Sequence, residues 1–270
     1  MDSIPLILFL LVFILILFGY PVALTLGGIS ILAGLFFFDI DFFYLVSLRI
    51  YGIMNNFVLL AVPLFVFMGL TLEKSGIAEK LLETMAILFG KIKGGLAYSV
   101  VIVGGMLAAS TGIVGATVVT MGLISLPTML KRGYDAKLAT GVIASSGTLG
   151  QIIPPSVVLV LLGSVLNISV GNLFISALLP GITLVFLYLV YIGIVTYFYP
   201  SSAPAMPSEM IKEFKEKTSI TNIINAFLLP FILIFAVLGS IFLGIASPTE
   251  AAGIVVNVGT LYSKDALLKY

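Results

Sequence analysis

The sequence predicts an all-α, polytopic transmembrane helical bundle that contains a re-entrant helical hairpin and one broken helix. Three observations predict this class. First, 60% of the 270 residues are hydrophobic and only 9% are charged, whereas a soluble domain carries about 25% charged residues. Second, apolar windows of roughly 17–25 residues, long enough to cross a bilayer as helices, recur along the chain. Third, two apolar stretches are interrupted by glycine, proline and hydroxyl residues.

The same composition argues against several functions. The chain has no histidine and no cysteine, so it lacks the commonest general base and metal ligand as well as any thiolate nucleophile. A net charge of +1 gives no sign of nucleic-acid binding. No nucleotide-binding G-x-x-x-x-G-K-[ST] motif occurs, and no paired carboxylates lie in apolar spans. The sequence therefore predicts neither an enzyme nor a cofactor.

Apolar helices are expected at regular intervals, and the segments between them are interpreted as surface structure. The expected helices cover 4–19, 21–38, 56–72, 138–164, 172–198, 223–245 and 248–263. The first has no basic flank and no cleavage site, so it is interpreted as a retained span. Residues 39–56 are expected to lie along the membrane surface. Residues 199–222 are interpreted as a soluble linker, with a short charged helix in "SEMIKEFKEK".

A further apolar stretch, 94–130, has a small and polar centre, "ASTGIVGAT". Each of its arms holds about 16 residues, or roughly 24 Å of helix, which is marginal for a full crossing. We therefore expect a hairpin that enters and leaves on one side, although two complete passes would give the same topology for the rest of the chain.

The basic residues predict the orientation. If the N-terminus lies outside, all of the 13 Lys and Arg residues except Arg49 fall in inside segments, as the positive-inside rule requires. The segment 73–93, with Glu79 and Glu83, is then an inside loop.

The second interruption, "GTLGQIIPPS" at 147–156, lies within the expected helix 138–164. Pro154 and Pro155 remove backbone donors, and Gly147 and Gly150 loosen the same turn. In lipid, such a break is tolerated only where it is buried in protein or lines a wet cavity. The freed carbonyls and the hydroxyls of 145–156, among them Thr148, would form an all-oxygen cradle, which hard cations prefer.

The hairpin tip offers the same chemistry in Ser110, Thr111, Gly112 and Thr117. A helix N-terminus at the tip would also attract an anionic substrate group. The sequence therefore predicts that tip and break meet at mid-membrane, with an ion site beside a substrate site. Small-residue helix packing at the tip and a purely structural kink at the prolines are the alternatives.

Two acidic residues are interpreted as helix caps. In "ASPTEAAG", Ser247 and Glu250 match a capping box, although an acid next to an apolar span is also a functional candidate. Asp135 in "KRGYDAK" is expected to cap or pair locally rather than to carry protons.

Residues 227–253 loosely echo the opening of the chain and start on the opposite side, as in an inverted repeat. Two ordinary apolar helices would explain the echo equally well. If the repeat is real, the second copy stops before any counterpart of 94–164, which predicts the N-terminal part of a longer permease.

These motifs, together with "LFISALLPGITL" at 173–184, resemble the DctM-like large membrane subunit of tripartite ATP-independent periplasmic (TRAP) transporters. The resemblance covers nearly the whole chain. It implies the first inverted repeat of an elevator-type ion transporter fold and the start of the second. The implied parts are 1–93 (scaffold helices and an inside loop), 94–164 (transport domain), 165–199 (a scaffold helix), 200–222 (a cytoplasmic linker) and 223–270 (an incomplete second repeat).

The resemblance also implies a function: Na⁺-coupled import of a small organic acid across the bacterial inner membrane, with the N-terminus periplasmic. The implied partners are a small four-helix (DctQ-like) subunit and a periplasmic solute-binding (DctP-like) protein. The implied ion and substrate region comprises Ser110, Thr111, Gly112, Thr117, Gly147, Thr148, Gly150, Pro154 and Pro155. The tip "STGIVGAT" departs from the usual "GSSxAT", which leaves its individual ligands open. The alternatives are a passive channel, a proton-coupled permease subunit, or a non-functional fragment.

Overall fold

The computed structural model describes residues 4–37, 41–74, 76–112, 114–207 and 220–253. These residues fold into helices joined by turns, and no strand occurs among them, which confirms the predicted all-α class. The chain divides into two compact units, residues 1–56 and residues 57–270. Each unit is described by itself.

The first unit contains three apolar helices. They are α1 (Ile4–Leu17), α2 (Val22–Phe37) and α3 (Asp41–Met54). Gly19 ends α1 with a φ of +87°, a left-handed conformation that glycine adopts without steric cost. At the other end of α2, a Cβ added to Gly34 would lie 2.3 Å from the Phe42 ring, so α3 packs directly on the α2 backbone. The helices predicted over 4–19 and 21–38 are therefore present, and the predicted surface segment is also helical.

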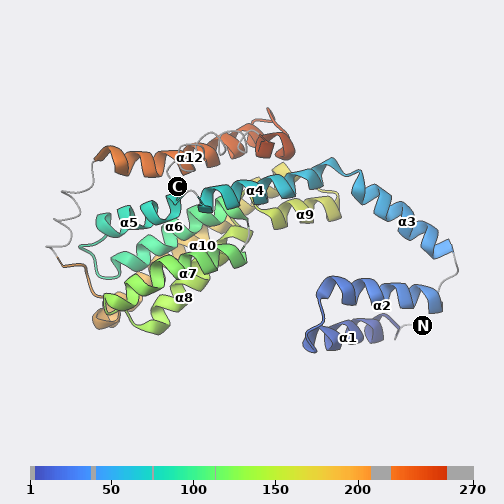
Figure 1. Ribbon diagram of the computed structural model, residues 1–270, viewed down its shortest axis with the longest axis horizontal. Helices are drawn as coiled ribbons and strands as arrows, with labels where there is room; N and C mark the ends of the chain where they lie inside the picture. The colour runs from blue at the N-terminus through green and yellow to red at the C-terminus, as the bar shows by residue number, and fades with distance from the viewer. Residues whose placement is uncertain (1–3, 38–40, 75, 113, 208–219, 254–270) are drawn as a thin grey trace. The chain divides into compact units, whose positions relative to one another are not determined.

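The second unit is a bundle that holds the hairpin and the broken helix (Figure 1). Its elements are η1 (Phe57–Leu60), α4 (Ala61–Lys74), α5 (Ile77–Leu88), α6 (Gly95–Thr111), α7 (Val114–Lys131), α8 (Ala136–Thr148), η2 (Leu149–Gln151), α9 (Val157–Leu166), α10 (Val170–Phe198), η3 (Pro200–Ser202) and α12 (Ile220–Phe242). A further helical stretch covers 248–253.

Two hydrophobic cores lie along α10, which contributes fully buried side chains to both. Near its start, Phe174 packs with α4, α9 and α12 around Phe65 and Val237. Near its end, Ile192 packs with α5, α6, α7 and α8 around Val100. Because α10 joins the two cores, it fixes the hairpin and the broken helix in one framework.

The hairpin forms as predicted, because only residues 112 and 113 separate α6 from α7. Helix α7 has 18 residues, or about 27 Å. Among the described residues, two unbroken helices, α7 and α10, are each long and apolar enough to cross a membrane. Length alone therefore permits α7 to cross, and the re-entrant path of the hairpin stays a prediction.

Helix α5 is the main element that the sequence analysis missed, since residues 73–93 were interpreted as an inside loop. Its apolar residues recur at helical spacing, and Leu81, Leu82 and Met85 are buried against the hairpin. Glu79 and Glu83 lie on the exposed side. A short amphipathic helix has too many charges to register in a search for uniformly apolar windows.

The first part of the predicted soluble linker is bound to the bundle. The amide of Gly94 donates to the carbonyl of Ala203 at 2.9 Å, that of Asp135 to Ser202 at 2.8 Å, and that of Met206 to Gly90 at 2.8 Å. Ala203 is fully buried. One strap, residues 199–207, thus joins the turn between α5 and α6 to the turn between α7 and α8. The predicted charged helix, 208–217, lies outside the described residues.

Both predicted caps are confirmed. The Asp135 carboxylate accepts from the amides of Lys137 at 2.8 Å and Leu138 at 3.2 Å, at the start of α8. In the capping box, the amide of Ser247 donates to Glu250 Oε2 at 2.8 Å, and the amide of Glu250 donates to Ser247 Oγ at 3.3 Å. These bonds satisfy amides that have no partner within the helix. The remainder of the span predicted over 248–263 lies outside the described residues.

Candidate functional site

The broken helix consists of α8 and α9, and a break of eight residues that include both prolines separates them. Helix α8 ends at Thr148, η2 follows, and α9 begins at Val157. The buried Ser156 joins the two sides: its hydroxyl donates to the carbonyl of Gln151 at 2.8 Å and accepts from the amide of Leu159 at 3.4 Å. The break is therefore an ordered structure that caps α9.

The hairpin tip contacts this break. Gly112 is buried, with a φ of +61°. A Cβ added to it would lie 3.1 Å from the amide nitrogen of Val157 and 3.7 Å from the carbonyl oxygen of Pro155. The contact that the sequence predicted between tip and break is present.

Three helix ends meet at this contact, and the end of α8 lies against the first turns of α7 at Val118. Helix α6 ends at the contact, and the last carbonyls of a helix lack the usual amide partner four residues on. Helices α7 and α9 begin here, and their first amides carry a partial positive charge. The contact between tip and break thus combines carbonyl ends that suit a cation with amide ends that suit an anion.

Gly147 has a packing role next to this contact. A Cβ added to Gly147 would lie 2.3 Å from Val118 Cγ2 and 3.0 Å from its Cα, so α8 approaches α7 at this point only because the side chain is absent. Thr117, one residue earlier on α7, is buried. For Gly147, the alternative of small-residue packing is therefore supported by the geometry.

The hydroxyls of α8 all bond back to their own helix. Thr148 Oγ1 donates to the carbonyl of Ser145 at 2.7 Å, Ser145 to Val142 at 3.1 Å, and Ser146 to Ile143 at 3.0 Å. A hydroxyl that donates its proton keeps its oxygen lone pairs for a cation. Thr148 is exposed and Ser146 is buried, so Thr148 is the more accessible of the two.

The remaining predicted residues divide into two groups. Gly150, Pro154 and Pro155 are buried in the break. The backbone of Ser110 and Thr111 belongs to the last turn of α6, but their side chains lie outside the described part. No group of three or more acidic side chains suited to a metal ion occurs among the described residues; any cation site here would rest on neutral oxygens.

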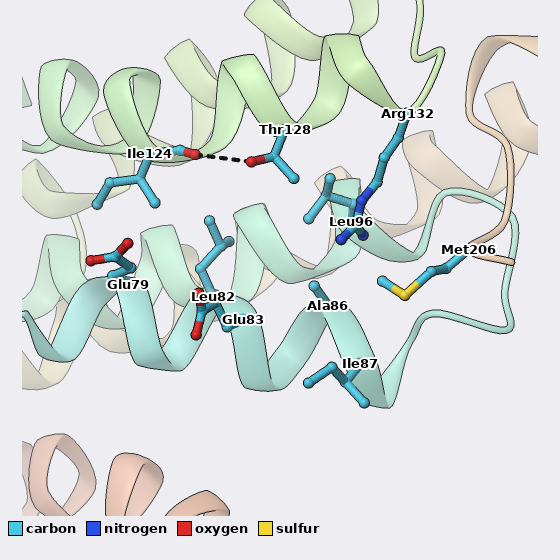
Figure 2. Close-up of a pocket in the computed structure, with 10 residues that line it drawn as sticks. All are labelled: Glu79, Leu82, Glu83, Ala86, Ile87, Leu96, Ile124, Thr128, Arg132 and Met206. Carbon is cyan, nitrogen blue, oxygen red and sulfur yellow. Dashed lines mark hydrogen bonds between the residues drawn. The ribbon is translucent and has the colours of Figure 1, made fainter. Parts of the chain in front are cut away.

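A charged cavity of about 210 Å³ lies at the opposite end of the hairpin (Figure 2). Glu79 and Glu83 line it from α5, and Arg132 lines it from the turn after α7. Glu83 is exposed but partly desolvated beside the cavity, which raises its pKa, and the nearby charge of Glu79 raises the pKa further. Burial lowers the pKa of Arg132, an effect that Tyr134 partly offsets. The cavity could not be predicted from the sequence, because residues 73–93 were interpreted as a loop and one of its walls is α5.

Comparison with known proteins gives one family for nearly the whole chain. The family model of the tripartite ATP-independent periplasmic transporter, DctM component, matches residues 9–262. The chain belongs to this family. This is a family of membrane transporter components and not of enzymes, as the sequence motifs predicted.

The DctM family members that match the chain have different stated substrates. The chain is 32% identical over 92% of its length to a C4-dicarboxylate TRAP transporter large permease of Vibrio cholerae, of which it covers 53%. It is 28% identical over 96% of its length to a sialic acid TRAP transporter permease of Haemophilus influenzae, of which it covers 42%. It is 29% identical over 92% of its length to an ectoine permease of Halomonas elongata, of which it covers 56%. The chain thus spans about half the length of these relatives.

Proposed function

We propose that the chain is part of the large membrane subunit of a Na⁺-coupled tripartite transporter that imports a small organic acid. The observation that carries this proposal is the contact of Gly112 with Val157 and Pro155. It supports a shared site for an ion and a substrate because it brings the C-terminus of α6 to the N-termini of α7 and α9, with the end of α8 against α7.

The ion would be held by neutral oxygens. Carbonyls at the ends of α6 and α8, together with the Thr148 hydroxyl, form the kind of ligand set that a hard monovalent cation accepts. An anionic carboxylate next to it would be stabilised by the amide ends of α7 and α9. Because each charge stabilises the other, ion binding and substrate binding would be coupled.

The assembly would follow that of the family. A periplasmic solute-binding protein would deliver the substrate, and a small four-helix subunit would accompany the large one in the bacterial inner membrane. The names of the three relatives state a C4-dicarboxylate, sialic acid and ectoine as substrates. All three molecules contain a carboxylate, which supports an organic acid as the substrate class.

Uptake measurements test the coupling. A permease that contains this chain is produced with its two partner proteins, and uptake of the acid delivered by the binding protein is followed in a Na⁺ medium and a Na⁺-free medium. We expect uptake to collapse without Na⁺. Uptake that persists without Na⁺ and follows only the pH gradient would favour a proton-coupled permease, and current without the binding protein would favour a channel.

Thr148→Val tests the ion ligand. The substitution preserves shape but removes an oxygen, so we expect the Na⁺ concentration for half-maximal uptake to rise about tenfold, the effect of losing roughly 1.4 kcal/mol. Thr140→Val is the matched control, because Thr140 makes the same type of bond on α8, to Ala136 at 2.8 Å, two turns from the break. An unchanged Na⁺ requirement in well-expressed Thr148→Val would remove this residue from the site.

A further inference from the structure

A groove of about 460 Å³ lies between α6, α8 and α10, apart from the predicted site. Its lining includes Val101, Lys137, Gly141, Leu187, Tyr188 and Tyr191. We call it the α8–α10 groove. Its volume falls within the range of about 300–1,000 Å³ that is typical of small-molecule sites.

The long wall of the groove is apolar and open. Val101 and Ile192 are fully buried at its floor, whereas Leu187 and Tyr191 are more than half exposed at its rim. A Cβ added to Gly141 would have no heavy atom within 4 Å. The missing side chain of Gly141 therefore leaves free space along α8 that no other part of the described chain fills.

One end of the groove is positively charged. Lys137 lies in the first turn of α8, and its ammonium forms no ion pair with any residue in the described ranges. The neighbouring carboxylate of Asp135 accepts from the amides of Lys137 and Leu138 and so caps the helix. Eight residues separate Lys137 from Ser145 at the other end of the groove, or about 12 Å along the helix.

We propose that the α8–α10 groove binds an anionic phospholipid, with its phosphate at Lys137 and an acyl chain along Gly141. A molecule with one charged end and a long apolar body matches this anatomy. A small organic acid paired with Lys137 would leave the apolar length of the groove along Val101 and Gly141 unfilled. An apolar helix of a partner subunit would leave the Lys137 ammonium without a counter-charge. The aromatic ring of Tyr191 suits the boundary between headgroup and acyl chain.

Lipid binding to the purified chain tests the apolar part of the site. The protein in detergent is titrated with phosphatidylglycerol, and bound lipid is counted by native mass spectrometry. We expect Gly141→Leu to lose one tightly bound lipid, because the leucine side chain would occupy the groove and its Cβ would meet no heavy atom within 4 Å. Gly28→Leu is the matched control, since Gly28 on α2 is exposed and equally unobstructed, and it should retain the lipid. Equal lipid retention in both variants would overturn the proposal.

Lys137→Gln tests the charged end. We expect its affinity for phosphatidylglycerol to fall about fivefold, the effect of one basic residue at an anionic lipid surface, while binding of phosphatidylcholine remains. Lys131→Gln, which changes a basic residue outside the groove, should have no effect. An unchanged preference for phosphatidylglycerol in Lys137→Gln would refute the phosphate contact.

The occupant in the membrane is identified by crosslinking. Tyr191 is replaced by the photoreactive p-benzoylphenylalanine, and membranes are irradiated before purification. A mass increase equal to a phospholipid supports the proposal. A crosslink to polypeptide, whether a partner or another part of a longer chain, would overturn it.

Discussion

At the scale of single residues, the candidate site depends on backbone contacts more than on side chains. Gly112 allows the tip to reach the break, and Gly147 allows α8 to reach α7. A Cβ at Gly147 would overlap Val118, and a Cβ at Gly112 would crowd Val157 in a left-handed conformation that favours glycine. The hydroxyls around them are already engaged with backbone carbonyls.

Gly112→Ala tests the tip. Alanine at a φ of +61° is strained, and its Cβ would press on the Val157 amide. We therefore expect the free energy of unfolding to fall by about 1–3 kcal/mol. Na⁺-dependent uptake should fall as well. Gly115→Ala, three residues further on, adds a methyl group in open space on α7 and should keep or slightly raise the melting temperature. Equal melting temperatures for both variants would contradict the close contact.

Glu83 gives a pH-dependent prediction. Its pKa in the folded protein is raised above the ordinary value of 4.5, first by burial and then by Glu79. Folding therefore favours the protonated form, and this contribution to stability is present below the unfolded pKa and lost as the pH rises through the folded pKa. We expect Glu83→Gln to melt like the wild type at pH 4 and at a higher temperature at pH 7. Melting curves that differ equally at both pH values would contradict this assignment.

At the scale of elements, the helices of the bundle are positioned by caps and turns outside the apolar spans. Asp135 caps α8, and its amide also donates to the strap at Ser202. The strap thereby connects the end of α10 with the start of α8. The position of the broken helix thus depends on a polar turn that lies about 20 Å from the break along α8.

Asp135→Ala tests the cap. Removing the carboxylate leaves two amides of α8 without a partner, and we expect a loss of about 1 kcal/mol of stability. Asp135→Asn preserves an acceptor oxygen, so its stability should be close to that of the wild type. Thermal unfolding in detergent distinguishes the two variants, and an alanine variant as stable as the asparagine variant would show that the cap contributes little.

At the scale of the whole molecule, the predicted orientation rests on the basic residues. The chain contains no cysteine, so single-cysteine variants need no prior substitution. With an impermeant maleimide applied to spheroplasts, whose periplasmic face is accessible, we expect Arg49→Cys to react and Lys80→Cys to remain unlabelled until the membrane is permeabilised. The reverse pattern would invert the topology, and labelling of both would refute the assignment of α5 to the inside.

Labelling also tests the path of the hairpin. Gly115 is exposed at the start of α7. If the hairpin is re-entrant, Gly115→Cys lies at mid-membrane and should react far more slowly than Arg49→Cys. If α6 and α7 both cross completely, the two positions should react at comparable rates.

The sequence by itself determined the apolar helices and both interruptions, because uniform hydrophobicity and clustered glycine and proline are local signals. It also determined the caps at Asp135 and Glu250, since each needs only neighbours within three residues. Only the tertiary structure decided that α5 covers the hairpin, that residues 199–207 join the α5–α6 turn to the α7–α8 turn, and that Gly141 opens a groove against α10. Those features depend on contacts between segments far apart in the chain, and the burial of a half-polar helix such as α5 is settled by the surface on which it packs.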